Sequence, residues 1–132
     1  MRIKVVAAAL FLSGLCFGGP ALAHHGAAAY DRSITLTLKA TITEFVFRNP
    51  HIILSFDATD DQGKVTHWNA EGGSSTGLAR RGWTYKTLKP GDQVTVVGNP
   101  ARGMEGKETR VMALTRVILP NGQVVGQQTL TQ

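Results

Sequence analysis

Four histidines are the side chains of this sequence best suited to hold a metal ion, and two of them, His24 and His25, are adjacent. A chain that began at His24 would offer its terminal amine and the Nδ1 atom of the same residue, which close a chelate ring on one ion. A third nitrogen would complete an arrangement that suits Cu(II). His25 offers a second arrangement, through the amine and the backbone nitrogen between. The alternative is a frayed tail that binds nothing.

His51 and Glu71 are the side chains expected to complete such a metal site. His51 directly follows the stiff Asn49-Pro50 corner, and the hairpin register derived below places it diagonal to Glu71. The other arrangement joins the tail to His67 and Asp57. One ion cannot bind both His51 and His67, because they lie roughly 20 Å apart at ~3.3 Å per residue. We expect the first arrangement; the alternative for His51 is a hydrogen bond to a turn.

A second candidate site, for an anion, consists of Arg80, Arg81 and Lys86. Arginine side chains bind carboxylates and phosphates through paired hydrogen bonds. Arg80 and Arg81 also have a structural explanation, because cations in the last turn of a helix interact favourably with its dipole. For the same reason Glu71 could accept hydrogen bonds from the N-terminus of the helix that follows it.

Nothing in the sequence predicts catalysis. No serine has the pattern of a nucleophile elbow, and the expected register does not join Glu44, Asp57 and Glu71 into an acid and base pair. The glycines around Gly103 and Gly106 do not match a phosphate-binding loop. We therefore expect a protein that binds and is not an enzyme.

The first 23 residues have the pattern of a signal peptide. Arg2 and Lys4 give a basic start, residues 5–17 are apolar, and Ala21-Leu22-Ala23 is a typical cleavage site. The apolar run is shorter than the roughly 20 residues that a spanning helix needs. Cleavage there removes 23 of 132 residues and leaves 109, residues 24–132, which we expect to form a single domain in the periplasm or outside the cell, without a membrane anchor.

The composition of the processed chain limits its chemistry. It lacks Cys16, the only cysteine, and so has neither a disulfide nor a thiolate ligand. Without Arg2 and Lys4, the 14 basic side chains become 12 against 9 acidic ones, a net charge of +3. Because this excess is small and spread along the chain, we do not expect a nucleic acid as a partner.

Alternating apolar and polar residues predict the strands. Ile34 to Thr43 alternates as a half-buried strand does, and a change of phase at Glu44-Phe45 predicts a bulge. Asn49-Pro50 ends this strand, because proline lacks an N–H and disfavours helical geometry in the residue before it. His51 to Thr59 then alternates again as a second strand.

Asp60 to Lys64 predicts a three-residue hairpin loop, with Gly63 in the left-handed conformation. This loop sets the register, in which Phe56 faces Trp68 on the core side and Asp57 faces His67 on the outer side. A two-residue loop would pair core positions with solvent positions.

The remaining elements are one helix and two long strands. Ser74 or Ser75 is expected to cap a helix that runs through Arg81, with Gly82 ending it and Trp83 folded back on the helix. The other expected strands are Asp92 to Gly98 and Thr109 to Leu119, followed by a short extension, Gln123 to Val125. This order is typical of a mainly β, five-stranded OB-fold-like barrel with one short helix between strands three and four. A flat two-layer α+β arrangement is the alternative.

Several motifs resemble those of an uncharacterised family of small exported bacterial proteins: His24-His25, Asn49-Pro50-His51, Arg80-Arg81-Gly82-Trp83 and Leu88-Lys89-Pro90-Gly91-Asp92. The resemblance covers nearly the whole processed chain and implies a domain of unknown function, with no activity to transfer. The chain departs from the pattern at Ala40, where glycine is common, and at Ser75, where proline is common. The first departure disfavours a left-handed bulge at Ala40.

The sequence therefore predicts an exported binding module. Its expected ligand is a metal ion, with copper as the metal indicated, or a small molecule near the Asn49-Pro50-His51 corner. The alternative is an interaction module, of unknown partner, that docks a protein or peptide on the outer face of the second and third strands. A copper enzyme with an N-terminal histidine brace is a third hypothesis.

Overall fold

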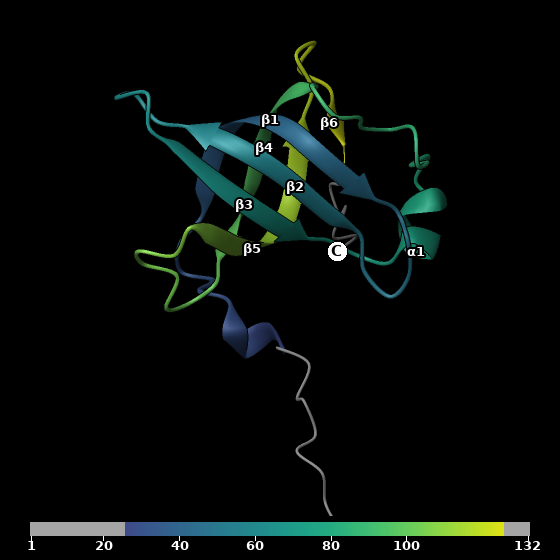
Figure 1. Ribbon diagram of the computed structural model, residues 1–132. Coiled ribbons are helices and arrows are strands. Elements are labelled where there is room, and N and C mark those ends of the chain that lie inside the picture. The colour runs from purple at the N-terminus through teal and green to yellow at the C-terminus, as the bar shows by residue number, and fades with distance from the viewer. Residues whose placement is uncertain (1–25, 126–132) are drawn as a thin grey trace, which may run out of the picture.

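The computed structural model of the protein describes residues 26–125 (Figure 1). The predicted signal peptide and both His24 and His25 lie outside the described residues. In chain order the elements are a 3-10 turn at Ala27–Ala29, β1 (Leu36–Val46), β2 (Ile53–Thr59), β3 (Val65–Glu71), α1 (Ser75–Ala79), β4 (Gln93–Pro100), β5 (Thr109–Ile118) and β6 (Val124–Val125). No helix in this range is long and apolar enough to cross a membrane.

Five of the strands close into a barrel. They are hydrogen-bonded in the order β3-β2-β1-β4-β5, and a further pairing of β3 with β5 joins the two edges. The β3–β5 pair is parallel, whereas the other pairs are antiparallel. Together with α1 between β3 and β4, this is the OB-fold arrangement, as predicted. The flat alternative is wrong, because the β3–β5 pairing leaves the barrel without a free edge.

β1 holds the barrel together by pairing on both sides. Ala40 pairs with Ala58 of β2 on one side and with Val94 of β4 on the other. Its register is regular, and it does not have the left-handed conformation of a bulge. The predicted bulge is confirmed as a register shift between Ile42 and Glu44. Ile34 was expected to begin this strand facing the core, and that prediction is wrong. Its N–H is held by a turn and its side chain is 45% exposed, so β1 begins two residues later.

The β2–β3 hairpin has the predicted register. Phe56 lies opposite Trp68 and Asp57 opposite His67. Gly63 has a φ of +79°, which favours glycine, and the N–H of Asp60 donates to the carbonyl of Lys64 at 3.0 Å. The two faces of the hairpin are therefore assigned as the sequence predicts.

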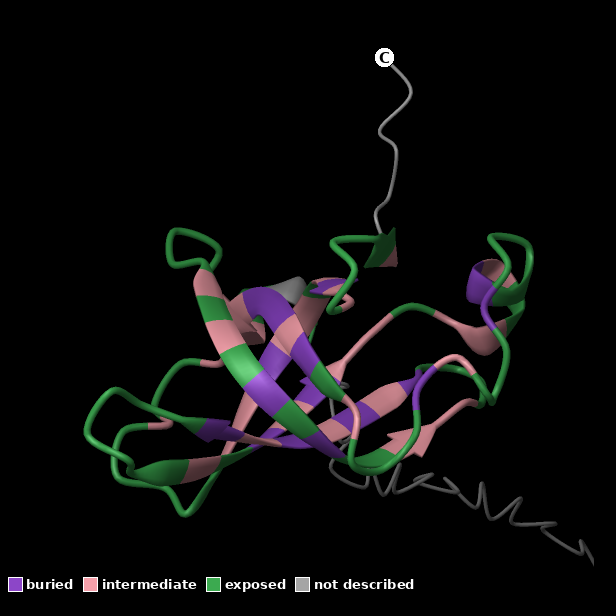
Figure 2. Ribbon diagram, turned by 90° about the horizontal axis from the view of Figure 1, so that it is seen from above, coloured by how far each residue is buried: buried purple, intermediate pink, exposed green. Residues whose placement is uncertain are grey.

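The core lies inside the barrel, and along β2 its buried residues alternate with less buried ones (Figure 2). Phe56 stacks on Trp68 with ring centroids 6.4 Å apart. Leu78 of α1, with Trp83 and Leu88 from the segment after it, packs into the same core and closes one end of the barrel.

α1 is shorter than predicted at its C-terminal end. It stops at Ala79 because the N–H of Arg81 donates to Leu78 at 2.8 Å in a tight turn. Gly82 follows with a φ of +88°, and the N–H of Trp83 donates to the carbonyl of Leu78 at 3.1 Å. These bonds are those of the predicted glycine cap.

The turn that leads into β4 predicts a loss of stability in acid. A hydrogen bond from the Lys89 side chain lowers the pKa of Asp92 below its ordinary value. Because the folded state favours the ionised carboxylate, its stabilisation is present above about pH 4 and is lost as the pH falls through the folded pKa. Asp92→Asn should lower the melting temperature at pH 7 but have little effect at pH 2. Thermal melts at both pH values, with Asp61→Asn as an exposed control, test this; equal effects at both pH values would contradict it.

Candidate functional site

The Asn49-Pro50 corner is held by side chains from the start of α1. Asn49 accepts a hydrogen bond from the Ser75 hydroxyl at 3.0 Å and donates one to the Thr76 hydroxyl at 2.8 Å. The hydroxyl of Ser74 accepts from the N–H of Gly77 at 3.1 Å, so Ser74 is the helix cap. The corner and the helix start therefore hold each other in place, and His51 follows directly from this fixed point.

His51 lies beside Glu71, as the register predicts. The Nδ1 atom of His51 is 3.0 Å from the carbonyl oxygen of Gly72. Because a carbonyl only accepts, Nδ1 carries the proton in this bond, and neutral His51 then presents an unprotonated Nε2. This Nε2 atom is 3.4 Å from Oε1 of Glu71, and both side chains are partly exposed to solvent.

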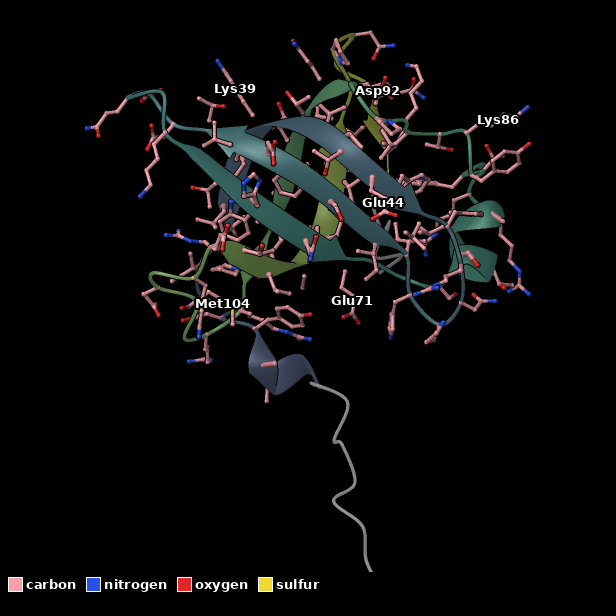
Figure 3. The ribbon with its side chains drawn as sticks, in the orientation of Figure 1. Lys39, Glu44, Glu71, Lys86, Asp92 and Met104 are labelled. Atoms are coloured by element: carbon pink, nitrogen blue, oxygen red, sulfur yellow. The ribbon has the colours of Figure 1, made fainter. Side chains whose placement is uncertain are left out.

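The second oxygen of Glu71 contacts Tyr30. The Tyr30 hydroxyl donates to Oε2 at 3.3 Å, and Figure 3 shows Glu71 directed outward at the end of β3. Burial, then the charge of Glu71, raises the pKa of the Tyr30 hydroxyl, which therefore keeps its proton as a donor. The hypothesis that Glu71 accepts hydrogen bonds from the N-terminus of α1 is wrong, because the side chains of Ser74 and Asn49 accept the backbone N–H groups there.

Tyr30 is a site residue that sequence reasoning missed. Its neighbours are fixed to the end of β4 and to the loop that follows: the N–H of Asp31 donates to Pro100 at 2.8 Å, and the N–H of Arg102 donates to Ala29 at 3.0 Å. An aromatic hydroxyl beside a run of alanines carries no sequence signal for a partner 41 positions away. Only this backbone pairing places it against Glu71.

The part of the chain that the structure describes contains no group of three or more His, Cys, Asp or Glu side chains that could hold a metal ion. His51 and Glu71 form a pair. The expected third ligand, His24 or His25, lies outside residues 26–125, so the metal site stays a prediction.

His67 is separate from this pair. Its Nδ1 atom lies 2.5 Å from Oδ1 of Asp57, the partner that the register predicts. On the same outer face the Ser55 hydroxyl donates to Asn69 at 2.9 Å. The middle of the outer face of β2 and β3 thus carries polar side chains that bond in pairs. Docking of a protein or peptide there stays a prediction.

Arg80, Arg81 and Lys86 are all exposed in the segment that follows α1, and the two arginines do not lie in its last turn as predicted. The Lys86 amine lies 5.4 Å from the ring centroid of its neighbour Tyr85. Within residues 26–125 none of the ion pairs includes these three side chains. Their role as an anion site also stays a prediction.

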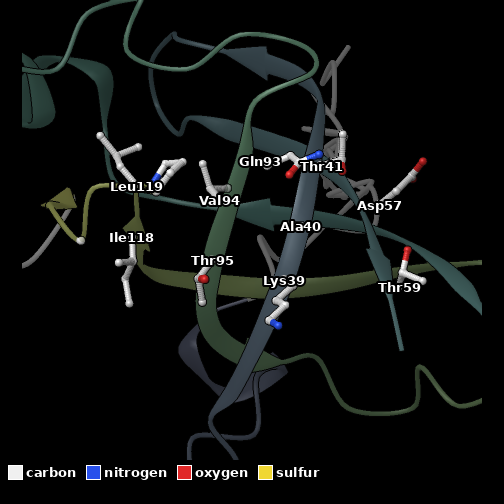
Figure 4. A pocket seen from close by; sticks show the side chains of 12 residues that line it. Lys39, Ala40, Thr41, Asp57, Thr59, Gln93, Val94, Thr95, Ile118 and Leu119 are labelled. Carbon is white, nitrogen blue, oxygen red and sulfur yellow. The ribbon is translucent and has the colours of Figure 1, made fainter. Parts of the chain in front are cut away.

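A groove of about 650 Å³ lies over β1, β2 and β4 and beside the turn after β5. Figure 4 shows Lys39 and Thr41 of β1 lining it together with Asp57 of β2 and Gln93 of β4. The lining combines polar side chains, with one cation and one carboxylate among them, with apolar ones such as Val94, Ile118 and Leu119. Among the described residues it contains no histidine.

Comparison with known proteins gives a family for this chain. The model of a family of unknown function, DUF6152, matches residues 13–110. No curated protein sequence matches the chain. Among solved structures, the chain is similar to the mitochondrial single-stranded DNA binding protein Rim1 from S. cerevisiae, with a TM-score of 0.48 and 12% identity, covering 66% of this chain and 93% of that chain.

Proposed function

The chain belongs to DUF6152, a family of unknown function, and we propose that it is an exported module that binds Cu(II) at the Asn49-Pro50-His51 corner. The proposal is argued from the side chains of this protein. The ligands are His51 and Glu71 from the barrel, and the terminal amine and ring of His24. In this proposal the protein holds the metal and performs no reaction.

The approach of His51 to Glu71 carries the proposal. When His51 is neutral, its Nε2 atom and Oε1 of Glu71 both present lone pairs, and they lie 3.4 Å apart. Two such acceptors repel unless a proton or a cation lies between them. The bond from Nδ1 of His51 to the Gly72 carbonyl is also the kind that orients metal-binding histidines in many proteins.

Chain length supports His24 as the third ligand. Tyr30, which bonds to Glu71, lies six positions after His24. Six residues span at most about 20 Å, so the chain is long enough for His24 to reach Glu71. The amine and imidazole of His24 would add two nitrogens to that of His51, a donor set that favours Cu(II).

Export is part of the proposal, since the chelating amine of His24 exists only after cleavage behind Ala23. The basic start and apolar run of residues 1–23 support this processing, and we place the mature protein in the periplasm or outside the cell.

Calorimetric titration with Cu(II) of a protein that begins at His24 tests the site. Binding should have a stoichiometry of one, and His51→Ala should weaken it at least about tenfold, because one nitrogen ligand is lost. Glu71→Gln should weaken it less, since the amide oxygen still coordinates. His67→Ala is the matched control on the same hairpin and should leave the affinity unchanged.

The reverse pattern, in which His67→Ala weakens binding and His51→Ala does not, would overturn the site. Equal melting temperatures of the metal-free variants exclude a loss of fold as the cause.

A further inference from the structure

The barrel has a hollow at the end opposite α1. There β1 and β2 diverge, because their pairing begins only at Ala40 opposite Ala58. A space of about 450 Å³ opens between the start of β1, the β2–β3 hairpin and the start of β5. Small ligands are commonly held in spaces of ~300–1,000 Å³, so this one has room for a small molecule.

Trp68 and Arg110 line the hollow on the core side. Trp68 stacks on Phe56 with an angle of 6° between the rings, and it lies opposite Arg110 in the β3–β5 register. The Cζ atom of Arg110 is 5.7 Å from the centroid of the Trp68 ring. The guanidinium therefore lies over the indole, where the ring attracts its positive charge.

Arg110 lacks a hydrogen-bond partner at its Nε atom. This atom is buried and unpaired among the described residues, and no ion pair within residues 26–125 includes Arg110. Buried donors in folded proteins almost always have a partner, so the Nε–H group of Arg110 is a candidate donor to a bound molecule. Because no hydrogen bond fixes Nε, the guanidinium can turn toward a group that enters the hollow.

The charges around the hollow favour an anion. Three cations, Lys39, Lys64 and Arg110, line it against two carboxylates, Asp60 and Asp61. The Asp60 carboxylate already has hydrogen-bond donors, because its Oδ1 accepts the backbone N–H groups of Gln62 and Lys64 in the hairpin turn. The threonines of the lining, Thr37, Thr59 and Thr66, add hydroxyl groups that can donate to a bound oxygen.

We infer that this hollow binds a small organic anion, whose carboxylate or phosphate group pairs with the guanidinium of Arg110 while the rest of the molecule lies beside Trp68. The guanidinium offers parallel N–H groups that match two oxygens of either group. Lys39 and Lys64 raise the local concentration of anions at the mouth. This site lies away from His51 and Glu71 and does not depend on the metal proposal.

The two tryptophans provide the readout. In ¹⁵N-labelled protein, residues 24–132, the indole N–H of Trp68 should shift on titration with succinate or with inorganic phosphate at constant ionic strength. The indole N–H of Trp83, buried at the other end of the barrel, should not move, and a Trp83→Phe spectrum assigns the two signals. The anion that acts at the lower concentration identifies the class of ligand.

Three variants test whether Arg110 binds the anion. Arg110→Gln should weaken binding at least tenfold, and Arg110→Lys should weaken it less because the charge stays. Arg116→Gln, on the same strand but outside the hollow, should bind like the wild type. The inference is overturned if neither anion shifts Trp68, or if the shift persists in Arg110→Gln.

Discussion

A protein that begins at His24 should bind Cu(II) at least about 100-fold more tightly than the same protein preceded by Gly-Ser-Gly-Ser. In the first protein the amine and Nδ1 of His24 bind one ion together, so the second contact is intramolecular. In the extended protein the amine becomes an amide, which is a poor ligand, and the chelate is lost. Competition titration with a Cu(II) chelator of known affinity measures the difference.

The length of the extension matters. A single added residue would place His25 third in the chain, where the amine, two amide nitrogens and the imidazole form a chelate of their own. Four residues avoid this arrangement. His24→Ala, which keeps a free amine, should lose most of the affinity as well. If the mature and extended proteins bind alike, the amine is not a ligand, and the proposed site fails whatever His51 contributes.

Gly98→Ala should destabilise the barrel by about 3 kcal/mol, a large fraction of the stability of a small domain. A methyl group at Gly98 would lie 2.3 Å from the backbone oxygen of Ala113 and 2.8 Å from the sulfur of Met112. The backbone oxygen cannot move aside without breaking the β4–β5 pairing, where the register shifts next to Gly98. Urea unfolding followed by circular dichroism measures the loss.

Gly73→Ala is the matched control. A methyl group at Gly73 meets no atom within 4 Å, and Gly73 does not have a positive φ. This variant should unfold within about 0.5 kcal/mol of the wild type. The prediction is wrong if Gly98→Ala is as stable as Gly73→Ala. That result would mean that β4 and β5 can move apart at this point without a loss of folding free energy.

The hairpin register explains why His51 and Glu71 lie beside each other, as the sequence predicts. His51 and Glu71 follow from the hairpin register, which depends on a loop of known length and on a side-chain period of two. Asn49 contributes in a way that the sequence did not indicate. Its amide bonds to α1, so the residue before Pro50 holds the helix start as well as ending the strand.

The sequence by itself determined the local features of this protein: the strand periods, the three-residue loop at Gly63, the glycine cap at Gly82 and the bulge in β1. Each depends on residues within a few positions of each other, where backbone sterics and hydrogen bonds leave few alternatives.

Only the tertiary structure decided which distant segments meet. The parallel β3–β5 pairing closes the barrel, places Arg110 over Trp68 and leaves its Nε without a partner. The pairing of the N-terminal segment with the β4–β5 loop brings Tyr30 to Glu71. Both contacts join residues far apart in the chain, so no local pattern predicts them.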